Sequence, residues 1–303
     1  MALFDYESAG SGISKNAPKK KGIKLFFDIF FRKFWQLFEV NFLYSLFFLP
    51  LLLIITAISV LENYTLILII SAFLILTFTI IIGPATAGMT KIMRCYMIEK
   101  HTFIVRDFFR TFRKNFKKAS IIGFLDCLVM FSVFASFRVY PAMASHYNMP
   151  ILYVPMTLTL SIALIVMMMN YYIYIMLVAT NLSLKNLIKN SFVLTFIGLK
   201  KNIITFVVTC ITFCFMLVIF RYLMPLFMIL LPFFPAAFLC FVSCFNSYPL
   251  IQKYVINPYY TSRGEINPEL AGNDSDEETI FEDKGGEEKP IEKRKKGKGK
   301  RIS

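Results

Sequence analysis

The sequence predicts an all-α membrane protein with about six spans, arranged as three hairpins that each follow an amphipathic helix. Composition is the first observation: 57% of the 303 residues are hydrophobic and 17% aromatic, with a mean hydropathy of +0.61. A soluble domain of this size could not bury so much apolar surface. The second observation is a set of long uncharged runs, and the third is a strongly uneven distribution of basic residues between them.

Six apolar runs are each long enough to cross a hydrocarbon layer of roughly 30 Å as a helix. None of them alternates apolar and polar residues, as the strands of a membrane β-barrel do. The predicted spans are 42–61, 64–82, 119–137, 151–180, 203–220 and 222–244. A membrane domain is therefore expected over residues 23–256. It lies between a disordered N-terminal segment, 1–22, and a disordered charged tail, 257–303.

The basic residues predict which loops face the cytoplasm. Seven of the 33 Lys and Arg residues precede the first span, nine lie between the second and third, four lie between the fourth and fifth, and eleven follow from Lys253 onward. The three opposite loops hold only Arg138 and Arg221, both at the ends of spans. Short loops rich in Lys and Arg stay in the cytoplasm, so both termini are expected there, with the protein in the cell membrane. This basic face is also expected to attract anionic lipid headgroups.

The first amphipathic segment, KLFFDIFFRKFWQLFEV (24–40), comes directly before the first span. At helical spacing, one side of it is apolar and aromatic. This side carries Phe26, Phe27, Phe30, Phe34, Leu37 and Phe38. A helix of this kind is expected to lie along the membrane surface.

The segment GPATAG (83–88) follows the second span. Gly83 is expected to end one helix and Pro84 to begin another, because proline suits the first turn of a helix. The small residues of this segment would allow helix backbones to approach closely, as they do in membrane helix interfaces. Two interpretations remain open: a plain helix break at the interface, or a re-entrant turn that lines a pathway.

The segment FIVRDFFRTFRKNFKK (103–118) interleaves phenylalanines with basic residues, which fall on opposite faces of a helix. The aromatic face includes Phe108, Phe112 and Phe116. The basic face includes Arg106, Arg110, Arg113, Lys114, Lys117 and Lys118. The segment is expected to lie at the membrane interface and to continue into the third span without a break. A groove on a partner protein is the alternative. Nucleic acid is not expected as a partner, because a nucleic-acid groove needs both residue types on one side.

A third amphipathic segment, LSLKNLIKNSFVLTFIGLKK (182–201), precedes the fifth span. Asn41, Asn115 and Asn202 stand near the three junctions between these segments and the spans. The chain thus divides into three similar units. Internal duplication would explain this, but the ordinary rhythm of a helical hairpin protein is the simpler interpretation.

Little in the sequence indicates catalysis. It has no phosphate-binding loop, no His-Glu-x-x-His and no Gly-x-Ser-x-Gly motif. No enzyme activity, cofactor or metal is therefore expected. Two cysteine pairs, Cys210/Cys214 and Cys240/Cys244, are spaced to share a helix face. Four thiols brought together could bind a soft metal, but small residues at a helix-packing seam are the simpler interpretation.

Asp126 is the candidate for function inside the spans. It lies about 10 Å past the cytoplasmic start of the predicted third span. An intramembrane carboxyl group usually faces the bundle interior or a water-filled cavity. Asn170 or the tyrosines of MMMNYYIY (167–174) are the expected partners. The group either fixes the register of the helices or binds a proton or another cation.

Three sequence blocks resemble the YesL family of bacterial membrane proteins, also called DUF624. They are NFLYSLFFLP (41–50), GPATAG (83–88) with Gly83 and Pro84 at its turn, and RDFFRTFRKNFKK (106–118). The resemblance covers roughly residues 25–255. The family occurs mainly in Gram-positive bacteria, often beside sugar-uptake genes, and brings no established catalytic or ligand residues.

The resemblance implies a non-enzymatic accessory or regulatory protein of carbohydrate uptake, with the permease subunits of a sugar transporter as expected partners. The alternative is a small transporter or channel that uses the polar groups around Asp126.

Overall fold

The structure is a computed structural model that describes residues 21–265 and residue 267. The disorder expected of residues 1–20 and 268–303 lies outside this part of the chain. The chain forms two units, Met1–Tyr259 and Tyr260–Ser303, and nearly all the described helices belong to the first. The last described helix, α12 (Asn257–Thr261), lies where the disordered tail was predicted to begin, so that prediction is wrong for residues 257–261.

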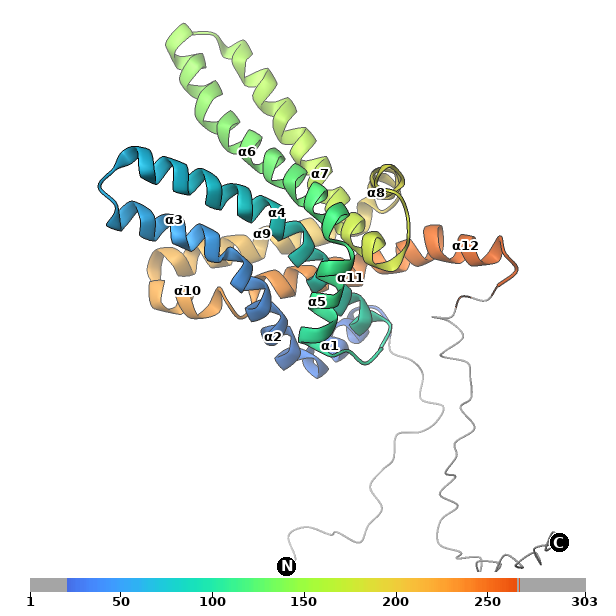
Figure 1. The fold of residues 1–303 in the computed structure, drawn as a ribbon. Coiled ribbons are helices and arrows are strands. Elements are labelled where there is room, and N and C mark those ends of the chain that lie inside the picture. Colours follow the sequence, from blue (N-terminus) through green and yellow to red (C-terminus); the bar gives the residue numbers. More distant parts are fainter. Residues whose placement is uncertain (1–20, 266, 268–303) are drawn as a thin grey trace, which may run out of the picture. The chain divides into compact units, whose positions relative to one another are not determined.

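The first unit contains helices throughout its described residues and no strand (Figure 1). Its α-helices are α1 (Ile23–Arg32), α2 (Phe34–Ser45), α3 (Leu49–Val60), α4 (Tyr64–Met97), α5 (Ile104–Lys114), α6 (Phe116–Tyr147), α7 (Tyr153–Ala179), α8 (Leu184–Ile197), α9 (Leu199–Tyr222), α10 (Met224–Leu230) and α11 (Pro235–Ile251). Short 3₁₀ turns, η1 (Leu46–Phe48) and η2 (Pro150–Leu152), precede α3 and α7, and a π-helical turn, Gln252–Ile256, joins α11 to α12.

Five helical segments are long and apolar enough to cross a membrane: Phe34–Val60, Tyr64–Met97, Phe116–Tyr147, Pro150–Ala179 and Leu199–Tyr222. A sixth is obtained if α10 and the helix from Pro235 to Thr261 are one span, although they meet at a bend of 53°. The predicted all-α fold is confirmed. The unbroken helix expected over 222–244 is wrong, because the chain leaves helical geometry between Leu230 and Pro235.

Each of the three amphipathic segments contains a single-residue break between two helices. The break residues are Lys33, Asn115 and Gly198, with φ/ψ of −106°/10°, −102°/9° and −91°/13°. The expected continuity of residues 103–118 with the third span is therefore wrong. At Asn115 the side-chain amide donates to Thr111 O (3.4 Å), the carbonyl that also accepts the Asn115 N–H (3.0 Å). Such local bonds by asparagine compete with a continuing helix.

The break expected at Gly83 and Pro84 is also wrong, because α4 runs through both residues. Proline has no N–H, so within a helix it leaves the carbonyl four residues earlier without its usual donor. That carbonyl is Ile80 O, and it accepts a hydrogen bond from Ser120 Oγ of α6 (2.8 Å). In an apolar environment such a substitute donor lets a helix continue past proline.

The small residues around this position allow α4 and α6 to approach closely, as expected from the sequence. A Cβ placed on Gly83 would collide with the backbone of Ala119, and one placed on Gly123 would collide with the backbone of Gly83. α4 is the central helix of the unit and packs against α2, α3, α5, α6, α7 and α11. The contact between Gly83 and Gly123 therefore fixes the positions of α4 and α6, which form two walls of the cavity described below.

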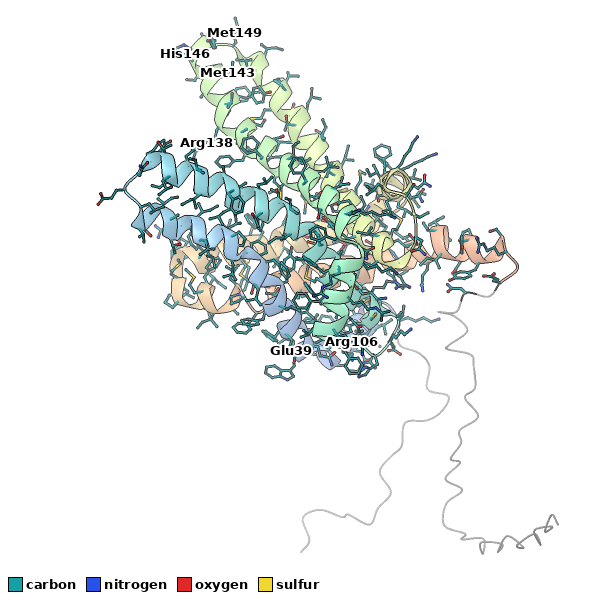
Figure 2. The ribbon with its side chains drawn as sticks, in the orientation of Figure 1. Glu39, Arg106, Arg138, Met143, His146 and Met149 are labelled. Atoms are coloured by element: carbon teal, nitrogen blue, oxygen red, sulfur yellow. The ribbon has the colours of Figure 1, made fainter. Side chains whose placement is uncertain are left out.

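The core lies at one end of the helices. In α4 the buried residues run from Gly83 to Tyr96, and none lies between Tyr64 and Ile82. In α7 they run from Met168 to Leu177. The opposite ends, where the hairpins turn, expose apolar side chains. Figure 2 shows Arg138 and His146 toward the turn of the α6–α7 hairpin and Arg106 at the other end of the molecule.

The first and last helices of the unit are joined at this packed end. Phe26 and Phe30 of α1 contact Phe241 of α11, with ring centroids 5.2 and 6.0 Å apart. Asn41 of α2 reaches both sides of the break between α10 and α11. Its amide donates to Leu231 O (3.2 Å), and its carbonyl oxygen accepts from Ala237 N (2.7 Å). The apolar side predicted for residues 24–40 thus packs largely on protein.

Candidate functional site

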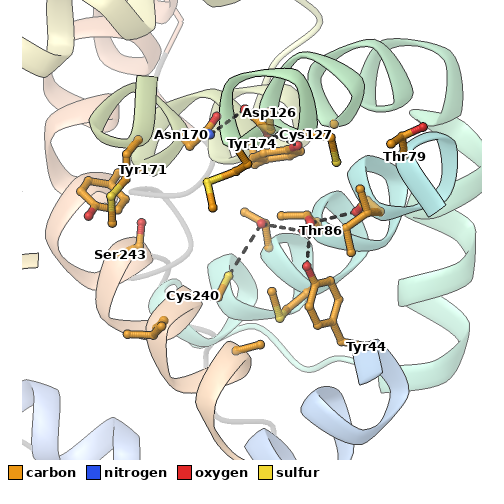
Figure 3. A pocket seen from close by; sticks show the side chains of 18 of the residues that line it. Tyr44, Thr79, Thr86, Asp126, Cys127, Asn170, Tyr171, Tyr174, Cys240 and Ser243 are labelled. Carbon is orange, nitrogen blue, oxygen red and sulfur yellow. Dashed lines mark hydrogen bonds between the residues drawn. The ribbon is translucent and has the colours of Figure 1, made fainter. Parts of the chain in front are cut away.

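A cavity of about 910 Å³ lies between α4, α6, α7 and α11, with contributions from Tyr44 and Phe48 (Figure 3). Its wall is mainly apolar and aromatic. Ile75 of α4 and Phe131 of α6 line it and remain 49% and 71% exposed, so the cavity opens to the surroundings of the helices. Both residues belong to helices that are long and apolar enough to span a membrane. We call it the Asp126 cavity.

Asp126 supplies the carboxyl group of this wall and is bonded to α7 through both of its oxygens. Asn170 Nδ2 donates to Oδ1 (2.7 Å), and the Tyr174 hydroxyl donates to Oδ2 (2.8 Å). Asn170 and Tyr174 are four residues apart and therefore share a face of α7. Asp126 itself lies about 15 Å along α6 from its first residue. Both types of partner expected from the sequence are present.

Among the described residues, the partners of this carboxyl group are Asn170 and Tyr174, and no Lys, Arg or His side chain pairs with it. The two bonds to Asp126 come from neutral donors. An unpaired carboxylate in an apolar wall is costly, so the group has two stable states: it holds a proton, or it binds a cation from outside. The site can therefore take up a positive charge without breaking an ion pair.

A second line of polar groups crosses the cavity from α2 through α4 to α11. The Tyr44 hydroxyl is 3.1 Å from Thr86 Oγ1, and Thr86 already donates to Ile82 O, so tyrosine is the donor. The Thr90 hydroxyl likewise donates to Thr86 O, so it accepts a hydrogen bond from the Cys240 thiol, with Oγ1 and Sγ 3.7 Å apart. The sequence did not predict this line of contacts, because Tyr44 and Cys240 lie far apart in the chain and no local pattern connects them.

The four paired cysteines are not brought together as a metal site. Cys210 and Cys214 are exposed on α9, whereas Cys240 is partly buried and Cys244 is buried on α11. Among the described residues no group of three or more His, Cys, Asp or Glu side chains could hold a metal ion. Cys240 and Cys244 instead line the Asp126 cavity.

The aromatic face of α5 is divided between protein and surroundings. Phe108 is fully buried, stacked on Phe47 with ring centroids 5.7 Å apart, and lies close enough to Gly88 of α4 to leave little room for a side chain there. Phe112 is half-buried, and 36% of the surface of Phe116 is exposed. The interfacial interpretation therefore needs correction: Phe108 anchors α5 to the protein and is not available to lipid.

The basic face of the same segment is also divided. Arg106, Arg113 and Lys117 are exposed. Arg110 and Lys114 line a smaller cleft between α5 and the end of α7. Lys118 donates to Leu182 O (2.8 Å) and so fixes the chain that follows α7.

The fold and this site define a helical membrane-embedded protein with an open cavity between its helices that carries a single carboxyl group. Residues 63–137 match the family model described as "Protein of unknown function, DUF624". The match takes in α4, α5 and most of α6, including Gly83, Pro84 and Asp126, so this part of the chain is similar to that family. No curated protein matches the chain, and no solved structure does.

Proposed function

We propose that this chain is a non-enzymatic, multi-pass component of the cell membrane that binds a small amphipathic molecule in the Asp126 cavity. The observation that supports this proposal is a carboxyl group without a cationic partner in the wall of a mainly apolar cavity. Such a wall fits a ligand with an apolar body and one cationic or hydrogen-bond-donating group, which would reach Asp126 between Asn170 and Tyr174.

The finer part of the proposal is an accessory or regulatory role in carbohydrate uptake, next to the permease subunits of a sugar transporter. This part depends on the family resemblance alone. A transporter or channel is the second candidate. It is favoured by the ability of Asp126 to gain and lose a positive partner without breaking an ion pair, which is what coupling to a proton or cation requires.

The binding proposal is tested with rhodamine 6G, a fluorescent lipophilic cation with N–H donors, on the purified full chain in neutral detergent. Saturable binding is expected, weakened about tenfold or more in Asp126→Asn because the partner charge is lost. Glu62→Gln is the matched control: it removes one carboxylate at the exposed turn before α4. Equal binding in Asp126→Asn and the parent chain would contradict the proposal.

A second experiment separates the two candidate roles. The chain is placed in liposomes, and rhodamine 6G flux and proton flux are followed. Flux that Asp126→Asn abolishes favours the transporter. Binding without flux, together with co-purification of sugar permease subunits from the native membrane, favours the accessory role.

A further inference from the structure

A second cavity, of about 380 Å³, lies between the end of α4, the polar side of α5 and the chain that leaves α7. We call it the basic cleft. Its wall includes Lys91, Asp107, Arg110, Thr111, Lys114 and Asn115, together with residues 177–181. The volume is within the range of small-molecule sites. The three cations come from two different helices, so they approach the cleft from different sides.

These cations have no acidic partner. Neither Lys91, Arg110 nor Lys114 forms an ion pair with any described residue. Lys91 is partly buried, whereas Arg110 and Lys114 are exposed at the mouth. Three cations against one carboxylate leave an excess of two positive charges in the cleft. This balance suits an anion with more than one negative charge, because like charges held together are costly unless a counter-charge joins them.

Two features of the cleft oppose an anion. One is the negative charge of Asp107. Its Oδ2 already accepts a hydrogen bond from Phe103 N (3.0 Å) at the start of α5. The other is the C-terminal end of α7, where helix carbonyls carry partial negative charge. Thr180 lessens the second effect, since its hydroxyl donates to Met176 O (2.7 Å). The three cations outweigh both features.

The wall of the cleft is held in place before any ligand arrives. Lys118 Nζ donates to Leu182 O (2.8 Å) and ties the chain after α7 to α6. Asn115 N and Nδ2 both bond to Thr111 O and fix the end of α5. A site whose walls are fixed in advance loses little entropy when it binds.

We propose that the basic cleft binds a phosphoryl group. Arginine presents a planar fork of donors that matches phosphate oxygens, and lysine adds point charges from other directions. Thr111 and Asn115 add neutral polar groups to the same wall. The phosphoryl group belongs either to a lipid headgroup or to a soluble phosphate ester, since the chemistry of recognition is shared.

The test is calorimetric titration of the full chain in neutral detergent with three probes: dihexanoyl phosphatidic acid, dihexanoyl phosphatidylcholine and inorganic phosphate. The variant Lys91→Gln/Lys114→Gln removes two cations from the cleft. The matched control Lys100→Gln/Lys117→Gln removes two exposed lysines that lie outside it. Both variants lower the net charge of the chain equally. Their elution in size-exclusion chromatography shows whether they fold. If the double variant of the cleft does not fold, Lys114→Gln alone is used in its place.

Saturable binding of phosphatidic acid is expected, weakened about tenfold or more in the cleft variant and little changed in the control. Inorganic phosphate that binds and displaces phosphatidic acid assigns the site to soluble phosphate compounds. Binding of phosphatidic acid without binding of inorganic phosphate assigns it to a headgroup. Equal weakening in the two variants would overturn the proposal, because it would reveal diffuse attraction to a basic surface. The proposal would also be overturned if neither phosphatidic acid nor inorganic phosphate showed saturable binding.

Discussion

At the scale of single residues, one hydroxyl group replaces the hydrogen-bond donor that Pro84 removes from α4. Ser120 of α6 donates to Ile80 O, the carbonyl that Pro84 leaves without a donor. Nothing in the sequence around Pro84 indicates this, because the donor lies on another helix. It is placed there by the close contact of Gly83 with Gly123. The partners of Asp126 could be predicted, since few residues on the neighbouring spans can bond to a carboxyl group.

Ser120→Ala should therefore destabilise the protein by about 1–3 kcal/mol, because it leaves the Ile80 carbonyl without a donor in apolar surroundings. Adding Pro84→Ala should recover much of this loss, because alanine restores the N–H that bonds to Ile80 O. Ser132→Ala is the control on the same helix. Its hydroxyl donates to Leu128 O (2.8 Å), a carbonyl within a continuous stretch of helix, so a small effect is expected. Denaturant unfolding in detergent micelles measures the parent chain, the three single variants and the double variant. Additive effects of Ser120→Ala and Pro84→Ala would contradict the explanation.

At the scale of elements, the sequence predicted the short helices before the hairpins, because each has a clear apolar side. It did not predict what those sides contact. Periodicity shows that a face is apolar but does not distinguish lipid from protein as its partner. Phe108 and Leu37 belong to such faces and are buried within the protein. The one-residue breaks were missed for a similar reason, since Lys33 and Asn115 are compatible with a continuing helix and Gly198 alone is a usual breaker.

Two phenylalanines of α5 test which part of its apolar face contacts protein and which part does not. Phe108→Ala should cost about 3–5 kcal/mol, because it leaves a cavity between α5 and α4. Phe109→Ala is the matched change one residue further on, at a side chain that is 38% exposed, and should cost much less. Thermal inactivation followed by size-exclusion chromatography compares them. Equal losses would show that both rings face the same environment.

The bend between α10 and α11 depends on one side chain of α2. Asn41→Leu would leave Leu231 O and Ala237 N without their partner, at about 1–3 kcal/mol for each unsatisfied group. Asn41→Asp keeps an acceptor for Ala237 N and should be intermediate. The readout is the labelling rate of the buried Cys244 of α11 by a thiol reagent, located by mass spectrometry. An unchanged rate in Asn41→Leu would show that the bend is held by other contacts.

At the scale of the whole molecule, composition and run length were sufficient to predict the helical class, and the uneven distribution of basic residues predicts its orientation. The packing of α1 and α2 on α11 could not be read from the sequence. Asn41 and Ala237 are separated by 196 residues, and no local pattern connects them. The Asp126 cavity was missed for the same reason, since its wall combines residues from helices throughout the unit.

Reporter fusions test the orientation. Fusions at Asn63 and Asn148, which lie at the turns of two hairpins, should behave as extracytoplasmic, because those loops lack basic residues. Fusions at His101, between α4 and α5, and after Tyr260 should behave as cytoplasmic. An enzyme that is active only in the cytoplasm, paired with one active only outside, gives both signals. A cytoplasmic signal at Asn148 would sink the proposed orientation.

The packing of α1 on α11 also affects how the chain is made. Phe26 and Phe30 leave the ribosome long before Phe241, their partner on α11. At translation rates of about 5–20 residues per second, the delay is on the order of 10–40 seconds. Throughout this interval the aromatic side of α1 lacks the helix that finally covers it. A nascent α1 can rest on the bilayer surface while it waits, as amphipathic helices do. The interfacial character visible in its sequence then describes an early stage of biosynthesis, and the folded protein retains the pattern with a different partner.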